Sequence, residues 1–187
     1  MVDATNLTNH LLIAMPSMDD PRFVKTVTYI CEHGPQGALG ITINRPLNMH
    51  LGEILASLEI TSQNTAIDNL PVFLGGPVQP ECGLILHPSQ HQWKSTRQLS
   101  ESVSLTSSTD CLQDFANGRY TDKSLIALGY VGWAAGQLEE ELTDNVWINS
   151  PASDPLLFDT PVEQRWQLAA RQLGFDISLL STDHGHA

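Results

Sequence analysis

Two β-rich segments joined by a short turn constrain the fold of this chain more than any other feature of its sequence. Residues 24–33 are rich in β-branched residues and tyrosine, and residues 38–44 form a second run of strand-forming residues. Between them, Gly34-Pro-Gln-Gly37 carries the residues that tight turns favour. The two runs therefore predict a β-hairpin, which Arg45-Pro46 ends.

The rest of the chain alternates short apolar runs with only a few helical patterns. Further strands are expected over residues 11–15, 72–74, 84–87, 103–106, 124–131 and 146–148. Helices are expected over residues 51–58, 109–116 and 137–142. This pattern favours an α+β fold over a doubly wound parallel sheet, which requires a helix after nearly every strand. Without a convincing linker or repeat, residues 1–187 are expected to form a single domain.

The last helix has the most explicit start signal. Thr160 as N-cap, Pro161 at the first helical position and Glu163 at the third match a capping box. One buried face is then marked by Val162, Trp166, Ala169 and Leu173. Gly174 is expected to end the helix.

Charge restricts the class of partner. Nine lysines and arginines against 21 aspartates and glutamates give a net charge of −12. Such a field repels phosphate backbones, and the basic residues are scattered along the chain rather than clustered. Direct nucleic-acid binding is therefore not expected.

Cysteine usage and the first residues bear on the compartment. Cys31, Cys82 and Cys111 include no close pair, which favours a reducing compartment over a disulfide framework. The first residues lack the positive and apolar regions of a secretory signal, and the apolar run 11–15 is far too short to span a bilayer. A cytoplasmic protein that does not insert into a membrane is expected.

Cys31 and His33 form the main candidate pair for covalent chemistry. Alternation along the predicted strand places both on one face with Val27 and Tyr29, so a thiol and an imidazole could act as nucleophile and base. Arg45, one strand away in the hairpin, would lower the pKa of the thiol. The alternative is that Cys31 is a small buried hydrophobic residue, as cysteines in apolar strands usually are.

A zinc site is conceivable at Cys82, His87 and His91, which are spaced C-x4-H-x3-H. The chain has no C-x-x-C pair, and Pro88 interrupts any helix that would present both histidines together. Ordinary core or surface histidines are the preferred interpretation, and His184 and His186 are expected to belong to a frayed tail. No metal and no cofactor are expected.

Three glycines, Gly129, Gly132 and Gly136, lie between a predicted strand and a predicted helix, where glycine-rich loops can bind phosphate. Their spacing matches no nucleotide-binding fingerprint, and the acidic run 139–141 would repel an anion. Close packing of the backbone around Trp133 is the preferred explanation.

Six segments, in one order, carry a recognisable pattern across almost the whole chain. They are 12–21 (LIAMPSMDDP), 29–33 (YICEH), 40–46 (GITINRP), 75–78 (GGPV), 127–139 (ALGYVGWAAGQLE) and 156–159 (LLFD). Together they resemble the AlgH/YqgE family of bacterial proteins. The resemblance implies a mixed, largely antiparallel, bifurcated β-sheet folded into a pseudo-barrel with helices packed outside. It implies no established activity, although some members are labelled as regulators of alginate synthesis or transcription.

One segment departs from the family pattern. After Gly75-Gly-Pro-Val78 the family usually has Asp-Arg-Gly, where this chain has Glu81-Cys-Gly83. A family function that depends on that arginine lacks its cation here.

The residues leave two functions open. The first is a non-enzymatic binding or regulatory domain for a protein or a small ligand, with a candidate surface at strand ends and glycine turns: Cys31, His33, Asn44, Arg45, Gly75, Gly76, Trp133 and Gln137. The second is a cysteine-dependent enzyme for acyl or thiol transfer that uses Cys31, His33 and Arg45. Any role in transcription would be indirect, through a protein partner. A monomer or weak oligomer is expected.

Overall fold

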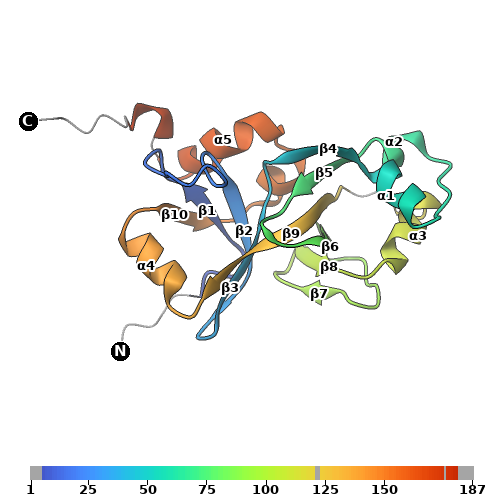
Figure 1. Cartoon of the computed structure of the whole chain (residues 1–187), viewed down its shortest axis with the longest axis horizontal. Helices are drawn as coiled ribbons and strands as arrows, with labels where there is room; N and C mark the ends of the chain where they lie inside the picture. The colour runs from blue at the N-terminus through green and yellow to red at the C-terminus, as the bar shows by residue number, and fades with distance from the viewer. Residues whose placement is uncertain (1–5, 121–122, 175, 181–187) are drawn as a thin grey trace, which may run out of the picture.

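A ten-stranded β-sheet runs through the centre of the computed structural model, which describes residues 6–120, 123–174 and 176–180 (Figure 1). The main path of strands is β10-β1-β2-β3-β9-β6-β8-β7, and β4 joins it through β5, which pairs with β9. Only the β5–β9 pairing is parallel among the described strands. The strands are β1 His10–Ala14, β2 Val27–Gly34, β3 Gly37–Thr42, β4 Pro46–His50, β5 Pro71–Leu74, β6 Val78–Pro88, β7 Arg97–Gln98, β8 Val103–Thr106, β9 Leu125–Ala134 and β10 Trp147–Pro151.

Helices cover the curled sheet at both ends, so the predicted α+β class is confirmed. They are α1 Leu51–Ser57, α2 Thr65–Asp68, α3 Asp110–Ala116, α4 Gln137–Thr143 and α5 Arg165–Arg171. In Figure 1, α1, α2 and α3 lie at one end of the molecule, whereas α4 and α5 lie at the other end near β1 and β10. None of the helices in the described ranges is both long and apolar enough to cross a membrane.

Strand β9 belongs to both ends of the molecule. Its first half, residues 125–128, lies between β5 and β6, whereas residues 131–134 pair with β3. Because side chains alternate along a strand, Leu125 and Ala127 join one apolar cluster and Ile126 joins another. A third cluster, around Val131, packs against α4. One strand thus supplies all three parts of the core.

The predicted hairpin is confirmed, but its first strand contains an irregularity. β2 and β3 pair up to Gly34 and Gly37, around the expected turn. The register shifts between Ile30 and Glu32, so Cys31 is the extra residue of a β-bulge. A bulge interrupts the alternation of side chains. The prediction that His33 shares a face with Cys31 therefore fails.

The chain crosses β9 at Gly75 and Gly76. The Gly75 N–H donates to the Leu128 carbonyl oxygen on the β5 side, whereas Val78 already pairs with β9 on the β6 side. A Cβ added at Gly76 would lie 2.1 Å from the carbonyl carbon of Tyr130. Opposite it, Gly129 has a φ of +72°. What the sequence presents as a turn is a close crossing of two backbone segments, which requires glycine.

The capping box predicted for the last helix is wrong. The Thr160 hydroxyl donates to the Pro155 carbonyl oxygen at 3.0 Å, so it closes the preceding π-helical turn, Pro155–Asp159. A 3-10 turn, Val162–Gln164, comes next, and α5 begins only at Arg165. Gly174 follows α5 with a φ of +86°, as expected for a residue that ends a helix.

Candidate functional site

Cys31 lies inside the core. Its side chain is 2% exposed and packs in the cluster that contains Leu11 and Tyr29. The thiol points to the Tyr29 carbonyl oxygen, with 3.8 Å between sulfur and oxygen. Burial raises the pKa of Cys31 far above its usual range, so the thiolate that a nucleophile requires does not form near neutral pH.

His33 lies on the face of β2 that α4 covers. Its Nδ1 accepts the Leu7 N–H at 3.1 Å, and its Nε2 lies 3.0 Å from the Glu139 carboxylate of α4. Because Nδ1 accepts a hydrogen bond, the ring proton belongs on Nε2, which donates it to Glu139. His33 therefore ties the backbone at Leu7 to α4, on a different face of β2 from Cys31.

Asn44 and Arg45 hold the loop between β1 and β2. The Asn44 side chain accepts the Val27 N–H at 2.8 Å and donates to the Lys25 carbonyl oxygen at 2.9 Å. Arg45 Nη2 donates to the Val24 carbonyl oxygen at 2.7 Å. Both side chains thus position a loop rather than activate a thiol.

The cation that acts on Cys31 is Arg97, not Arg45. Arg97 favours a lower pKa for the Cys31 thiol, but burial, which raises that pKa, is the larger effect. Arg97 itself is bound to the Glu32 carboxylate, with 2.6 Å between Nη1 and Oε2. The group of thiol, imidazole and guanidinium on which the enzyme hypothesis depends is therefore not assembled.

A groove between the β1–β2 loop and α4 collects several of the remaining predicted residues. We call it the tryptophan groove: a hollow of about 360 Å³ lined by residues 18–20, 22, 23, 77, 78, 131–133, 137, 141, 146 and 147. A second hollow of about 120 Å³ adjoins it through Arg22, Phe23 and Pro77. Arg45, Gly76, Trp133 and Gln137 line these two hollows. Cys31, His33, Asn44 and Gly75 line neither of them.

A carboxylate organises the floor of the tryptophan groove. Glu141 Oε2 accepts the indole N–H groups of Trp133 at 2.9 Å and Trp147 at 2.8 Å. Glu141 Oε1 accepts from the Gln137 side-chain amide at 2.8 Å. Both indoles are almost fully buried, so this carboxylate satisfies two donors that water does not reach. The aromatic wall of the groove is thereby fixed in place.

The outer edge of β9 opens onto the same groove. Tyr130 pairs with Val78 across this edge, and the Ala134 N–H donates to the Gln137 side chain. The backbone N–H and C=O groups of every second residue along a strand point to the same edge. Gly132 is two residues from both Tyr130 and Ala134, so its N–H and C=O point to this edge. No strand in the described parts of the chain pairs with Gly132 there, because β3 occupies the opposite edge. The exposed edge is short, and it is flanked by Pro77.

The histidines of the zinc hypothesis form part of an aromatic cluster. His87 is fully buried, its Nδ1 donates to the Pro88 carbonyl oxygen at 2.9 Å, and its Nε2 lies 2.8 Å from the Thr106 hydroxyl. Its ring packs on Trp93 at 4.9 Å between centroids. Over the described ranges, no group of three or more potential ligand side chains could hold a metal ion. His184 and His186 lie outside those ranges.

The protein is expected to lose stability when the pH is lowered below about 6.5, because of His87. Burial lowers the pKa of His87 from its ordinary 6.5, so the unfolded chain takes up this proton first as the pH falls. The stabilisation that neutral His87 provides is therefore complete above pH 6.5, and it is lost as the pH falls through the lowered pKa of His87. The midpoints of urea denaturation, recorded from pH 8 to pH 5, measure this loss of stability. We expect His87→Gln to flatten the dependence of the urea midpoint on pH.

Sequence reasoning missed the residues that give the groove its shape. Glu141 has one usable signal, because it stands four residues after Gln137 on the same predicted helix face. Arg22, Phe23 and Pro77 carry no such signal, since they reach the groove only through the loop that Arg45 holds and the crossing at Gly76.

Comparisons with known proteins agree on one family. A family model described as AlgH-like matches residues 11–178. A UPF0301 protein of Thioalkalivibrio sulfidiphilus is 48% identical over 187 residues, with both chains covered completely, and one of Nitrosococcus oceani is 46% identical over 179 residues, 96% of each chain. The solution structure of the AlgH protein from Pseudomonas aeruginosa is 46% identical, covers 100% of this chain and 99% of its own, and has a TM-score of 0.81. A crystal structure from Corynebacterium diphtheriae, 17% identical over 95% and 92% of the two chains, has the same fold, with a TM-score of 0.72.

Proposed function

The chain belongs to the AlgH-like family, and because the names of these relatives state no reaction, we propose a function from the geometry. The proposal is a non-enzymatic binding domain, in which the tryptophan groove takes up an extended segment of a partner protein. The outer edge of β9 at Gly132 carries this proposal, since it offers a main-chain donor and acceptor inside a groove.

Strand addition is the binding mode that fits this edge. An extended peptide that continues the line of β6 would pair with Gly132 through two main-chain hydrogen bonds. Such bonds give affinity with little dependence on sequence, and neighbouring hollows then select side chains. Here Phe23 and Trp147 line the same groove as Gly132, and they favour apolar side chains of the peptide.

Charge favours a basic segment. The chain carries a net charge of −12, and Asp19 is exposed at the rim of the groove. Arg22, the cation at this rim, is already bound to Asp20, with 2.7 Å between Nη2 and Oδ2. A peptide with lysine or arginine beside an apolar residue is therefore expected to associate faster, and to weaken at high salt.

The two alternatives are less well supported. A cysteine-dependent enzyme needs an ionisable thiol, and burial keeps the pKa of Cys31 far too high for one. An indirect role in regulation is compatible with the proposal, because a groove that binds a protein segment is one way to act without touching DNA.

Selection of random peptides on the immobilised protein tests the proposal, with two substitutions at one position as the discriminating pair. Gly132→Pro removes the N–H that the peptide would use, whereas Gly132→Ala keeps it. An added Cβ at Gly132 meets only the Tyr130 ring, at 3.9 Å, so the alanine variant is expected to fold normally. We expect selected peptides to bind Gly132→Ala like the wild type and to bind Gly132→Pro at least tenfold more weakly.

The selected sequences and the melting temperatures complete the test. Enrichment of basic residues beside an apolar one is expected, and the melting temperature of Gly132→Pro should remain close to that of the wild type. Peptides that bind both variants equally would contradict strand addition at Gly132, and so would a selection that enriches no peptide.

A further inference from the structure

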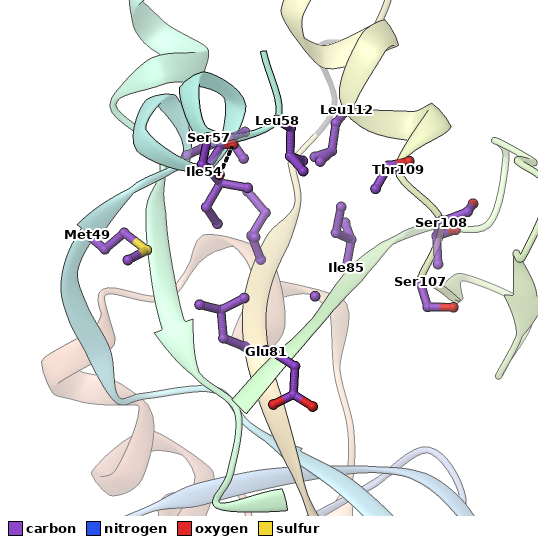
Figure 2. A pocket seen from close by; sticks show the side chains of 15 residues that line it. Met49, Ile54, Ser57, Leu58, Glu81, Ile85, Ser107, Ser108, Thr109 and Leu112 are labelled. Atoms are coloured by element: carbon purple, nitrogen blue, oxygen red, sulfur yellow. Dashed lines mark hydrogen bonds between the residues drawn. The ribbon is translucent and has the colours of Figure 1, made fainter. Parts of the chain in front are cut away.

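A further hollow, which shares no lining residue with the tryptophan groove, lies between α1, α3, β6 and β9 (Figure 2). We call it the aliphatic pocket. It has a volume of about 350 Å³, within the range of small-molecule sites. Its walls are branched aliphatic side chains from four elements: Leu51, Ile54, Ile85, Leu112, Ile126 and Leu128. Figure 2 shows labelled members of this set, Ile54, Ile85 and Leu112, around a common space.

Four of the five described hydroxyl side chains that line the aliphatic pocket already have a hydrogen-bond partner, Thr106 among them. The Ser57 hydroxyl donates to the Ile54 carbonyl oxygen at 2.7 Å, the Ser107 hydroxyl lies 3.2 Å from the Ser95 hydroxyl, and the Ser108 hydroxyl is bound to Asp110. Water gains little in such a space because it needs polar partners there. A hydrocarbon group gains from leaving water.

A glycine keeps the pocket open. A Cβ added at Gly83 would meet no atom within 4 Å, so space that a side chain could fill is left empty at this point of β6. This contrasts with Gly76, where the backbone of β9 occupies the same kind of space. A side chain at Gly83 is therefore expected to take up part of the volume of the pocket.

One charged side chain stands at the rim. Glu81 is the only ionisable residue among the described residues that line the aliphatic pocket, and its exposed carboxylate lies at the lower edge in Figure 2, beyond the aliphatic side chains. No ion pair within the described ranges neutralises it. An anionic head group would be repelled there, and a cationic one attracted, in keeping with the net charge of −12.

We propose that the aliphatic pocket binds a small aliphatic amine, with the hydrocarbon chain among the leucine and isoleucine side chains and the ammonium group at Glu81. None of the described residues in the lining has an aromatic ring, which disfavours a flat aromatic ligand that depends on stacking. Leu58, which is 44% exposed at the mouth of the pocket, covers the part of the ligand's hydrocarbon chain nearest the solvent. This site is independent of the tryptophan groove.

Three ligand series of matched chain length test the proposal: n-alkylamines, n-alkanols and n-alkanoates from four to eight carbons, titrated into the labelled protein and followed by amide chemical shifts. We expect saturable shifts at Gly83 and Ile126 and none at Gly132. Affinity should rise about fourfold per methylene group until the pocket is full. Since the rim is exposed, amines should exceed alkanols by only about two- to fivefold, and alkanoates should bind most weakly.

Variants separate the pocket from its rim. Gly83→Leu fills the space and should reduce alkylamine affinity at least tenfold, whereas Glu81→Gln should keep the chain-length dependence and remove the preference for amines over alkanols. Leu58→Lys, at an exposed position, places a repelling cation at the mouth, and it serves if Gly83→Leu does not fold.

Three results would overturn the proposal. One is the absence of saturable binding in all series. Another is alkanoate binding as tight as that of the amines. The third is unchanged amine affinity in Gly83→Leu or, if that variant does not fold, in Leu58→Lys. None of them bears on the peptide proposal, because its variants lie at Gly132.

Discussion

Gly76→Ala is expected to remove most or all of the free energy of unfolding, about 5 kcal/mol or more. The new Cβ would lie 2.1 Å from the Tyr130 carbonyl carbon and 2.2 Å from its oxygen, so the two crossing backbones would have to separate. The Gly75 hydrogen bond to Leu128 and the Val78 pairing with Tyr130 stand on either side of this crossing, and both would be strained. Circular dichroism with urea titration measures the loss.

Gly83→Ala is the matched control for this prediction. It makes the same chemical change seven residues further along, inside β6, but the added Cβ meets no atom within 4 Å. We expect a midpoint equal to or slightly above that of the wild type, because alanine also restricts the unfolded chain. Equal stability of the two alanine variants would show that the backbones do not cross as closely as described.

Glu141→Leu is expected to destabilise the protein by about 2–4 kcal/mol. It leaves the indole N–H groups of Trp133 and Trp147 without their acceptor, and each buried donor without a partner costs about 1–3 kcal/mol. Glu141→Gln should cost less, since its amide oxygen can still accept a hydrogen bond. Urea denaturation followed by circular dichroism measures the loss in each variant.

Glu140→Leu controls for the change of residue type and charge on the same helix. Glu140 is exposed, so its replacement is expected to change stability by no more than about 0.5 kcal/mol. A Glu141→Leu variant as stable as Glu140→Leu would mean that the indoles find other acceptors, and that the groove wall does not depend on this carboxylate.

The local elements could be predicted because their signals are local. The turn between β2 and β3 was identified from its glycines, and residues 103–106 form a strand with the predicted bounds. Helix α3 ends at Ala116, the last residue of the predicted helix, and Gly118 follows it with a φ of +66°. The resemblance to a known family added the curled sheet, which no local pattern contains. Short elements such as β4, α2 and β7 were missed because their residues show no clear periodicity.

The candidate site was harder to predict because it depends on two departures from regular geometry. Ile30 and Cys31 are both buried, so the sequence shows two consecutive apolar residues and gives no sign of which is the extra one in the bulge. The crossing at Gly76 depends on Tyr130, which is far away along the chain. Patterns within a segment predict its own shape, but they do not predict which distant backbone it touches.

Strand β9, which β3, β5 and β6 share as a neighbour, also sets the order in which strands can pair during synthesis of the chain. β3, β5 and β6 all precede β9 in the sequence, and each of them pairs with it. A nascent chain that has not yet reached Leu125 therefore holds three strands that lack this common neighbour, with edges open to other chains. Neither end of the molecule can close until the ribosome has released β9, which makes this interval the time of greatest exposure to aggregation.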